Sequence, residues 1–174
     1  MRWLCFIFAV SLLAADAPKG MLLYEQTREG VDRVLEECLT KGVTRLEVVL
    51  LPAGEAKANP YGDYAMGYGG QAHTDLALPN PAFFQHLDWV LKRAAGKQIE
   101  LAILPMDRDS GLLKSNSTEK ALEWGRYLGR RYMKARKLVW LRQSTESFGP
   151  ILAIEAGIGL FDSKHRFELQ MTSK

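Results

Sequence analysis

Three segments of the chain each follow an apolar run, and together they carry aromatic rings, carboxylates and amide groups. Aromatic rings stack on the apolar face of a pyranose, while carboxylate and amide oxygens accept hydrogen bonds from its hydroxyl groups. These residue types indicate a carbohydrate site, although tyrosine, glycine and aspartate are also common in turns, which leaves ordinary loops as the alternative. The candidates are Asn59, Tyr61, Asp63, Tyr64, Tyr68, His73 and Asp75 in the first segment, Asp107 and Asp109 in the second, and Gln143, Glu146 and Phe148 in the third.

Other kinds of chemistry lack their sequence motifs. Gly67, Gly69 and Gly70 precede no predicted helix, so a nucleotide-binding phosphate loop is not expected. The chain has no nucleophile elbow and no paired-cysteine motif, and its three histidines have no metal-ligand spacing. We therefore predict neither a metal nor a cofactor, and we expect His86 to occupy an ordinary surface or edge position on an amphipathic helix.

Composition and charge indicate one globular domain. The chain has 174 residues, of which 47% are hydrophobic and 25% are charged, which is enough apolar material for a real core. The net charge is +3, and the basic run at residues 126–137 has acidic residues nearby. We interpret this run as a solvated helix face and predict no nucleic-acid partner.

The N-terminus has the pattern of a secretory signal peptide. Met1 and Arg2 give a positive start, residues 3–13 form an apolar run too short to span a membrane, and residues 15–17 provide a small-x-small cleavage site. We predict a signal peptide at residues 1–17, a domain at residues 18–174, secretion or a periplasmic location, and no membrane span after cleavage; a retained anchor is the alternative. Of the two cysteines only Cys38 would then remain, and its place on an apolar helical stripe predicts a buried structural thiol.

Periodicity predicts alternating helices and strands. Thr27 can cap a helix that ends at Gly42, Asn80 with Pro81 can start a second helix, and Asn116 with Glu119 resembles a capping box for a third. Short runs rich in β-branched and apolar residues read as buried strands. The expected strands are residues 43–51, 99–105, 137–141 and 165–171, and a fourth helix is expected at residues 150–160.

This alternation calls for an α/β fold with a parallel sheet. Part of a (β/α)8 TIM barrel and an open doubly wound sheet both fit the pattern. The segments that follow strands are long (residues 52–79, 106–116 and 142–149), and ligands bind at the carboxyl ends of the strands in both architectures. We therefore expect any site to be built from these three segments.

Five blocks of the sequence resemble the apiosidase-like family of glycoside hydrolases. They are TREGVDRVLEECLTKGVTRLEVVLL, ANPYGDYAM, LPNPAFFQHLDWVLKRAAGKQIELAILP, EWGRYLGRRYMKARKLVW and AIEAGIGLFDSKHRFEL. The resemblance implies a (β/α)8 barrel, here incomplete, from a secreted bacterial enzyme that acts on plant-type polysaccharide side chains. It implies two carboxylates at the top of the barrel, and it favours Asn59, Tyr61, Asp63 and Asp107 as substrate-binding residues.

The resemblance also points to one candidate catalytic residue. Where the family carries an aspartate as its expected general acid, this chain has Thr145, and Glu146 follows it. The second carboxylate is expected from a later strand. Because glycoside cleavage needs two carboxyl groups at a fixed separation, we expect this chain alone to have little turnover. A non-catalytic carbohydrate-binding module and an unrelated α/β interaction domain are the alternatives, and the exposed edges of an incomplete sheet predict self-association.

Overall fold

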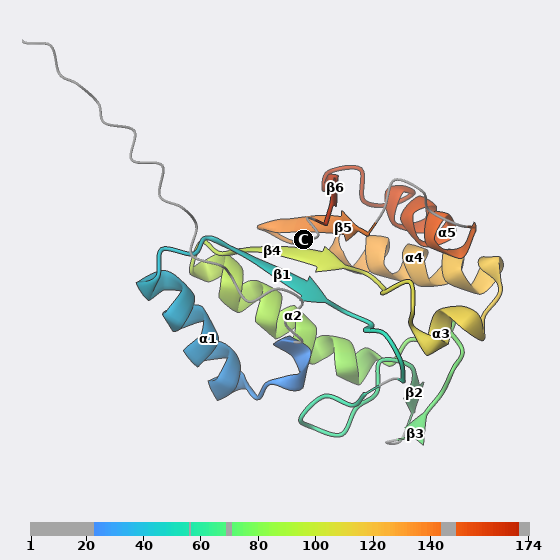
Figure 1. Cartoon of the computed structure of the whole chain (residues 1–174), viewed down its shortest axis with the longest axis horizontal. Helices are drawn as coiled ribbons and strands as arrows, with labels where there is room; N and C mark the ends of the chain where they lie inside the picture. Colours follow the sequence, from blue (N-terminus) through green and yellow to red (C-terminus); the bar gives the residue numbers. More distant parts are fainter. Residues whose placement is uncertain (1–22, 56, 69–70, 144–148, 171–174) are drawn as a thin grey trace, which may run out of the picture.

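The structure is a computed structural model that describes residues 23–55, 57–68, 71–143 and 149–170 (Figure 1). Four parallel strands form its main sheet, in the order β1-β4-β5-β6. The strands are β1 (Arg45–Val49), β4 (Glu100–Leu104), β5 (Leu138–Arg142) and β6 (Phe167–Leu169). The longer helices are α1 (Arg28–Thr40), α2 (Pro81–Gly96), α4 (Thr118–Tyr132) and α5 (Gly149–Gly159).

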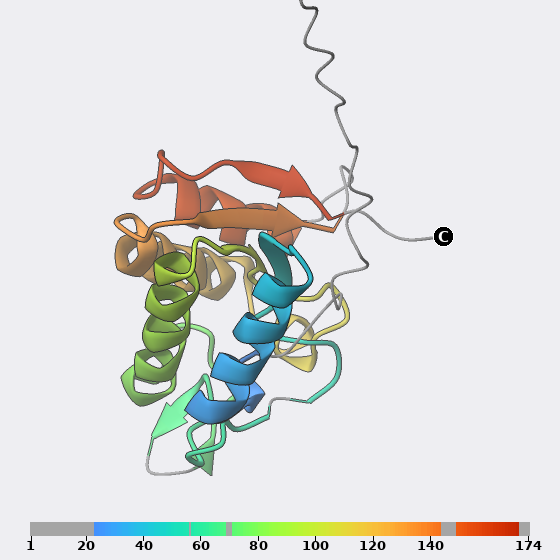
Figure 2. The ribbon, with the colours of Figure 1, turned by 90° about the vertical axis from the view of Figure 1, so that its left-hand side faces the viewer.

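Strand order and helix placement decide between the two predicted architectures. Each strand pairs with the next one along the main sheet, and β1 lies at an edge, whereas a doubly wound sheet would place its first strand centrally. Helices α2, α4 and α5 lie on one side of the sheet (Figure 2). Their side chains share one apolar cluster with Leu46, Ile103 and Trp140 of the strands. The sheet is therefore a segment of a barrel-type fold, as predicted, and it is not closed.

The opposite face of the sheet carries a second, smaller apolar cluster. Its members are Val49, Ala102, Leu104, Val139 and Leu141. They alternate along the strands with the residues that face the helices, because successive side chains of a strand point to opposite faces. In a closed barrel this face would be the interior, and it is apolar here toward the carboxyl ends of the strands.

Local signals set the helix ends as predicted in two cases. The Thr27 hydroxyl accepts from the Gly30 amide, and the Asn80 side chain accepts from the Ala82 amide, so both residues are N-caps. Gly42 has a φ of 70°, and the amide of the following residue, Val43, reaches back to the carbonyl of Cys38 at 2.8 Å. This is a Schellman termination, in which glycine carries the left-handed residue without strain. The thiol of Cys38 is buried, as expected.

The third helix starts one residue later than predicted. Ser117, not Asn116, is the N-cap of α4, and its hydroxyl accepts from the Lys120 amide. The capping-box prediction for Asn116 is wrong because the side chain of Asn116 is engaged by a segment far away in the sequence, as described below. The prediction for His86 is also wrong: this side chain is only 3% exposed, and its Nε2 lies 2.9 Å from the carbonyl oxygen of Gln26.

The long segment after β1 contains structure that the sequence does not suggest. Strands β2 (Gly67–Tyr68) and β3 (Gln71–Ala72) form a small antiparallel pair within it. Ala65, Met66 and Leu76 are buried and join the main core. Two short helical turns complete the described part of the fold, η1 (Leu23–Glu25) and α3 (Gly111–Lys114). The segment is therefore a packed part of the domain.

Helices α4 and α5 approach each other unusually closely. A Cβ on Gly125 would lie 2.1 Å from the carbonyl oxygen of Ile154, and one on Gly157 would lie 2.4 Å from that of Leu122. Only glycine leaves room for such backbone contact.

In the described part of the chain, no helix is both long and apolar enough to cross a bilayer.

Candidate functional site

The segments that follow β1 and β4 are joined by backbone hydrogen bonds at the carboxyl end of the sheet. The Asp107 amide donates to the Leu51 carbonyl at 2.8 Å, and the Gly54 amide donates to the Asp109 carbonyl at 3.2 Å. The Gly111 amide in turn donates to the Gly54 carbonyl at 2.9 Å. These bonds hold two of the three predicted site segments side by side, where parallel-sheet proteins bind their ligands.

Asp107 is the side chain that organises this end of the sheet. Its Oδ1 accepts from the backbone amide of Asp109 at 2.8 Å, and its Oδ2 accepts from Nε2 of Gln143 at 2.9 Å. Oε1 of Gln143 accepts from the Arg108 amide at 2.7 Å. Gln143 follows β5, so one side-chain pair ties the segments after β4 and β5 together and fixes the orientation of the Asp107 carboxylate.

An ion pair lies at the end of β5 but faces the helices. Nη2 of Arg142 is 3.1 Å from Oε2 of Glu155 on α5, and the Glu155 side chain is 12% exposed. Burial raises the pKa of Glu155, and the nearby guanidinium of Arg142 opposes that shift. Arg142 alternates with Trp140 on the helix-facing side of β5. The pair therefore anchors α5, and the sequence signal for it was an arginine directly after an apolar strand.

In the first segment, Asn59 acts on the backbone around it. Its Oδ1 accepts from the amides of Tyr61 and Asp63, at 2.9 and 3.0 Å, and its Nδ2 lies 3.5 Å from Oδ2 of Asp63. Asn59 is 4% exposed. Because asparagine stabilises turns by bonding to amides two or more residues ahead, this geometry shapes the turn at residues 59–63.

Tyr61 presents an aromatic ring to solvent above a buried histidine. Its side chain is 54% exposed, and its ring meets the His86 ring edge-on at a centroid distance of 5.2 Å. The His86 ring also stacks on Trp89 at 6.1 Å. Burial lowers the pKa of His86, and Arg28 lowers it further, so the imidazole is neutral at pH 7. An exposed ring held in this way can serve as a stacking platform for a sugar.

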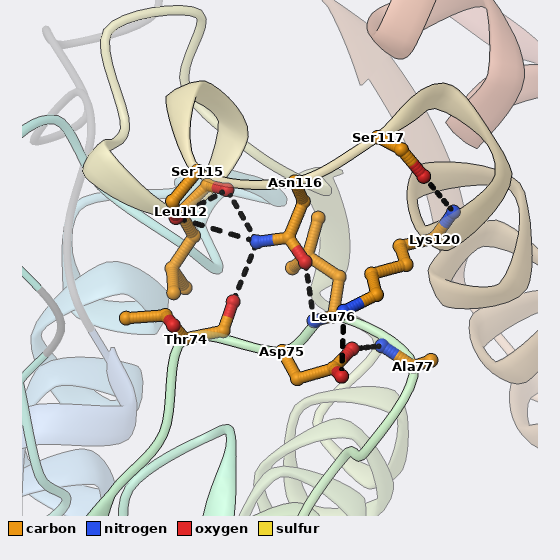
Figure 3. A network of polar contacts seen from close by, with 9 residues as sticks. All are labelled: Thr74, Asp75, Leu76, Ala77, Leu112, Ser115, Asn116, Ser117 and Lys120. Carbon is orange, nitrogen blue, oxygen red and sulfur yellow. Dashed lines mark hydrogen bonds and ion pairs between the residues drawn. The ribbon is translucent and has the colours of Figure 1, made fainter.

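Asn116 attaches the end of the first segment to the helices (Figure 3). Its Oδ1 accepts from the Leu76 amide at 3.1 Å, and its Nδ2 donates to the carbonyls of Thr74 and Leu112 at 2.5 and 2.7 Å. Beside it, the Asp75 carboxylate pairs with Nζ of Lys120 at 2.7 Å. The contact with Lys120 and the bond from the Ala77 amide hold the pKa of Asp75 below its usual value.

The predicted site residues therefore fall into two groups. Asn59, Tyr61 and Asp63 form one turn, and Asp107 lies with Gln143 at the strand ends. Among the described residues, no hydrogen bond or ion pair links the two groups directly. Glu146 lies outside the described residues, so its catalytic role stays a prediction. Among the described side chains, no three His, Cys, Asp or Glu residues are arranged to hold a metal ion.

Residues 13–168 match the family described as the apiosidase-like catalytic domain. The chain belongs to this family. No curated protein matches the sequence. The family match covers β1, β4, β5 and the first two residues of β6, the helices between them, and both groups of site residues.

Solved structures of glycoside hydrolases have the same fold as this apiosidase-like chain. One described as a glycoside hydrolase has a TM-score of 0.69 at 18% identity, covering 86% of this chain and 34% of its own. Another, a glycoside hydrolase family 5 protein from Bacteroides vulgatus, has a TM-score of 0.68 at 20% identity, covering 87% and 34%. The apiosidase-like chain thus spans about a third of the length of these relatives, and at this identity the likeness concerns the fold.

Proposed function

We propose that this apiosidase-like domain binds oligosaccharides of plant-type polysaccharide side chains at the carboxyl end of its sheet, in a secreted or periplasmic setting. The observation that carries the proposal is the hydrogen bond from Gln143 to Asp107, 2.9 Å long, which fixes a carboxylate between two strand ends. A fixed carboxylate with unused lone pairs is a suitable acceptor for paired sugar hydroxyls. The exposed ring of Tyr61 adds a stacking surface on the neighbouring turn.

The proposal includes weak or absent turnover by this chain alone. Cleavage of a glycosidic bond by the usual mechanism needs a protonated carboxyl group and a second carboxylate at a defined separation. The described residues bring Asp107 and Asp109 to this edge, but they share one tight turn, and Asp107 is already committed to two donors. These two residues therefore do not form such a pair, and Glu146 is left as the candidate acid.

Oligosaccharide binding can be tested with calorimetry on the folded chain. Neutral oligosaccharides from plant side chains are titrated into the native protein, Asp107→Asn and Gln143→Ala. We expect both variants to lose affinity about ten-fold, because each removes a charge-assisted or oriented hydrogen bond. Glu123→Gln, an exposed carboxylate on α4 that pairs with Arg126, is the matched control and should bind like the native chain. Unchanged binding by Asp107→Asn would remove the basis of the proposal.

Turnover is tested separately. Purified native protein and Glu146→Gln are incubated with branched pectic substrates, and released sugar is measured. We expect little release by either protein. Robust release by the native chain that disappears in Glu146→Gln would show that the chain is a competent hydrolase and would contradict the second part of the proposal.

The edges of the described sheet give the proposal a further expectation. Strands β1 and β6 each have one neighbour in the described sheet, so the outer edge of each is open to pairing. Self-association through these edges belongs to the proposal and would appear as a concentration-dependent mass in sedimentation. A mass that stays that of one chain at every concentration would exclude it.

A further inference from the structure

A groove lies at the opposite end of the sheet from the predicted sugar site. It has a volume of about 630 Å³ and runs between the last turns of α2 and α4, next to the residues that lead into β4 and β5. The two helices are neighbours on the same side of the sheet (Figure 2). Leu91, Ala95 and Ala135 give it an apolar lining, and its volume falls within the range of small-molecule sites.

The rim of this groove is strongly cationic. It is lined by Lys92, Arg131, Lys134, Arg136 and Lys137. Asp88 is the one carboxylate in the lining, and it is occupied by Arg131 through a forked contact of 3.0 and 2.6 Å. In the described part of the chain, the other four cations have no ion-pair partner.

Helix ends account for only part of this charge. A helix C-terminus is equivalent to about half a negative charge, so basic residues are common in a last turn. The two helix ends at the groove therefore offset about one of the four cations that Asp88 leaves unpaired. The groove keeps a positive surplus, and the fold alone gives no reason for it.

A buried hydroxyl lines the same groove. Tyr132 is 3% exposed, and its hydroxyl oxygen makes no hydrogen bond of good geometry among the described residues, although the Asp88 carboxylate lies close enough to act on it. Burial raises the pKa of this hydroxyl, and the Asp88 carboxylate raises it further, so the group remains a proton donor. An unsatisfied buried donor costs stability unless a ligand or water completes it.

Two strained backbone positions also line the groove. Among the described residues, Gln98 and Lys137 are the two non-glycine residues with positive φ, at 61° and 58°. Glycine would adopt this conformation without cost, and the equivalent turn before β1 has Gly42. Gln98 and Lys137 thus place an amide and an ammonium group at positions whose left-handed backbone conformation would favour glycine.

We propose that this groove is a second binding site, which takes a segment of an acidic oligosaccharide and holds its carboxylate groups against the free cations. Arg131 with Asp88 shows that the groove accommodates a carboxylate facing a guanidinium. The Tyr132 hydroxyl and the Gln98 amide supply neutral hydrogen-bonding groups suited to sugar hydroxyls. The site would attach the domain to a charged polymer while the opposite end of the sheet handles the neutral side chains.

The choice of a sugar over another polyanion rests on the proposed function. Nucleic acid is the main competitor for a basic surface, but its single strands are usually held by exposed aromatic rings as well. The one aromatic residue in the lining, Tyr132, is buried against Trp140. The groove therefore offers charge and polar groups without a stacking surface.

The test compares two sets of charge removals in the full chain. The groove variant carries Lys92→Gln, Lys134→Gln and Arg136→Gln, and the control variant carries Arg33→Gln, Lys41→Gln and Lys114→Gln. All six side chains are exposed, so both variants should fold. A short oligogalacturonate, neutral dextran, dextran sulfate and a DNA oligonucleotide are titrated into each protein at low and at physiological salt.

We expect the native and control proteins to bind oligogalacturonate more tightly at low salt, and the groove variant to lose at least about ten-fold in affinity. Tyr132→Phe keeps the ring and every charge, and it should also weaken binding of oligogalacturonate. Equal losses in both triple variants would show diffuse attraction and overturn the proposal, as would binding of DNA or dextran sulfate in preference to the uronate.

This outcome is separable from that of the proposed function. Asp107→Asn should retain oligogalacturonate binding, and the groove variant should retain binding of neutral side-chain oligosaccharides. If the native chain binds oligogalacturonate but no neutral oligosaccharide, the strand-end site is refuted and the groove remains. If the native chain binds neutral oligosaccharides but no oligogalacturonate, the groove alone is refuted.

Discussion

Arg45 of β1 and Glu168 of β6 form an ion pair 2.7 Å long, although these strands are the two edges of the main sheet. Three strand spacings separate the edges, which amounts to roughly 14 Å on a flat sheet. Arg45 also contacts Glu100 on β4, at 3.3 Å. The long arginine side chain reaches the far edge across the face that the helices leave free. The pair therefore indicates that the sheet is curved, which brings its two edges closer together than they would be in a flat sheet.

The ion pair predicts a small, pH-dependent coupling. Both side chains are about a third exposed, so a double-mutant cycle of Arg45→Gln and Glu168→Gln should give a coupling of about 0.5 kcal/mol in urea unfolding. Arg166 and Arg45 hold the pKa of Glu168 below its usual value. The stabilisation is therefore present above about pH 4.5 and is lost as the pH falls further. A coupling that persists at pH 2 would contradict this account.

The contact between α4 and α5 predicts a severe effect from one methyl group. Gly125→Ala would place its Cβ against the Ile154 carbonyl, and we expect a loss of about 3 kcal/mol or more because two helices must separate. Gly159→Ala, in α5, is the matched control, since nothing lies within 4 Å of the added Cβ. That variant should be neutral or slightly stabilising. Urea unfolding of both variants distinguishes close packing from a general intolerance of α5 and α4 to substitution.

The burial of the His86 imidazole predicts that the folded chain loses stability in mild acid. Burial lowers its pKa below 6.5, so the unfolded chain takes up a proton at this residue more readily than the folded chain does. The contribution of neutral His86 is therefore present above about pH 6.5 and declines as the pH falls below it. His86→Gln keeps a donor for the Gln26 carbonyl but cannot titrate. We expect its unfolding free energy to change less between pH 7 and pH 5 than that of the native chain; identical slopes would be the contrary result.

The hydrogen bonds of the Asn116 side chain predict that replacing it weakens the attachment of the first segment. In Asn116→Asp an oxygen would replace the Nδ2 group that donates to the carbonyls of Thr74 and Leu112, at a cost of about 1–3 kcal/mol. We expect faster proteolysis within residues 71–79 as well as a lower unfolding free energy. Ser115→Ala is the control, because among the described residues Ser115 bonds only to the turn before it and to Asn116. Unchanged proteolysis in Asn116→Asp would show that other contacts hold the segment.

Sequence patterns located the secondary structure because helix caps and apolar periodicity are local. Thr27 and Asn80 cap the helices that were expected to start there, and the four predicted strands occur within about two residues of their expected ends. Local rules failed where a distant partner competed for a side chain. Asn116 fits a capping pattern, but the amide of Leu76 and the carbonyl of Thr74, both from a distant segment, engage its side chain together with the nearby carbonyl of Leu112.

The candidate site divides in the same way. Residue types and their position after strands identified Asp107 as a candidate, since parallel strands deliver such residues to one edge. The partnership of Asp107 with Gln143 joins residues 36 positions apart and depends on the register between β4 and β5. The basic run at residues 126–137 was interpreted as a solvated face, and only the packing of α4 beside α2 places part of it around a groove.

The sequence by itself determined that this is an α/β chain with its chemistry after the strands, because periodicity and residue type are properties of short stretches. Tertiary structure decided the barrel-type strand order, the burial of His86 and the hydrogen-bond or ion-pair partner of each polar side chain. Those features depend on which distant segments meet, and that is set by the packing of whole helices and strands against one another. Arg45 and Glu168 show the difference most directly, since only a curved sheet lets one side chain connect its two edges.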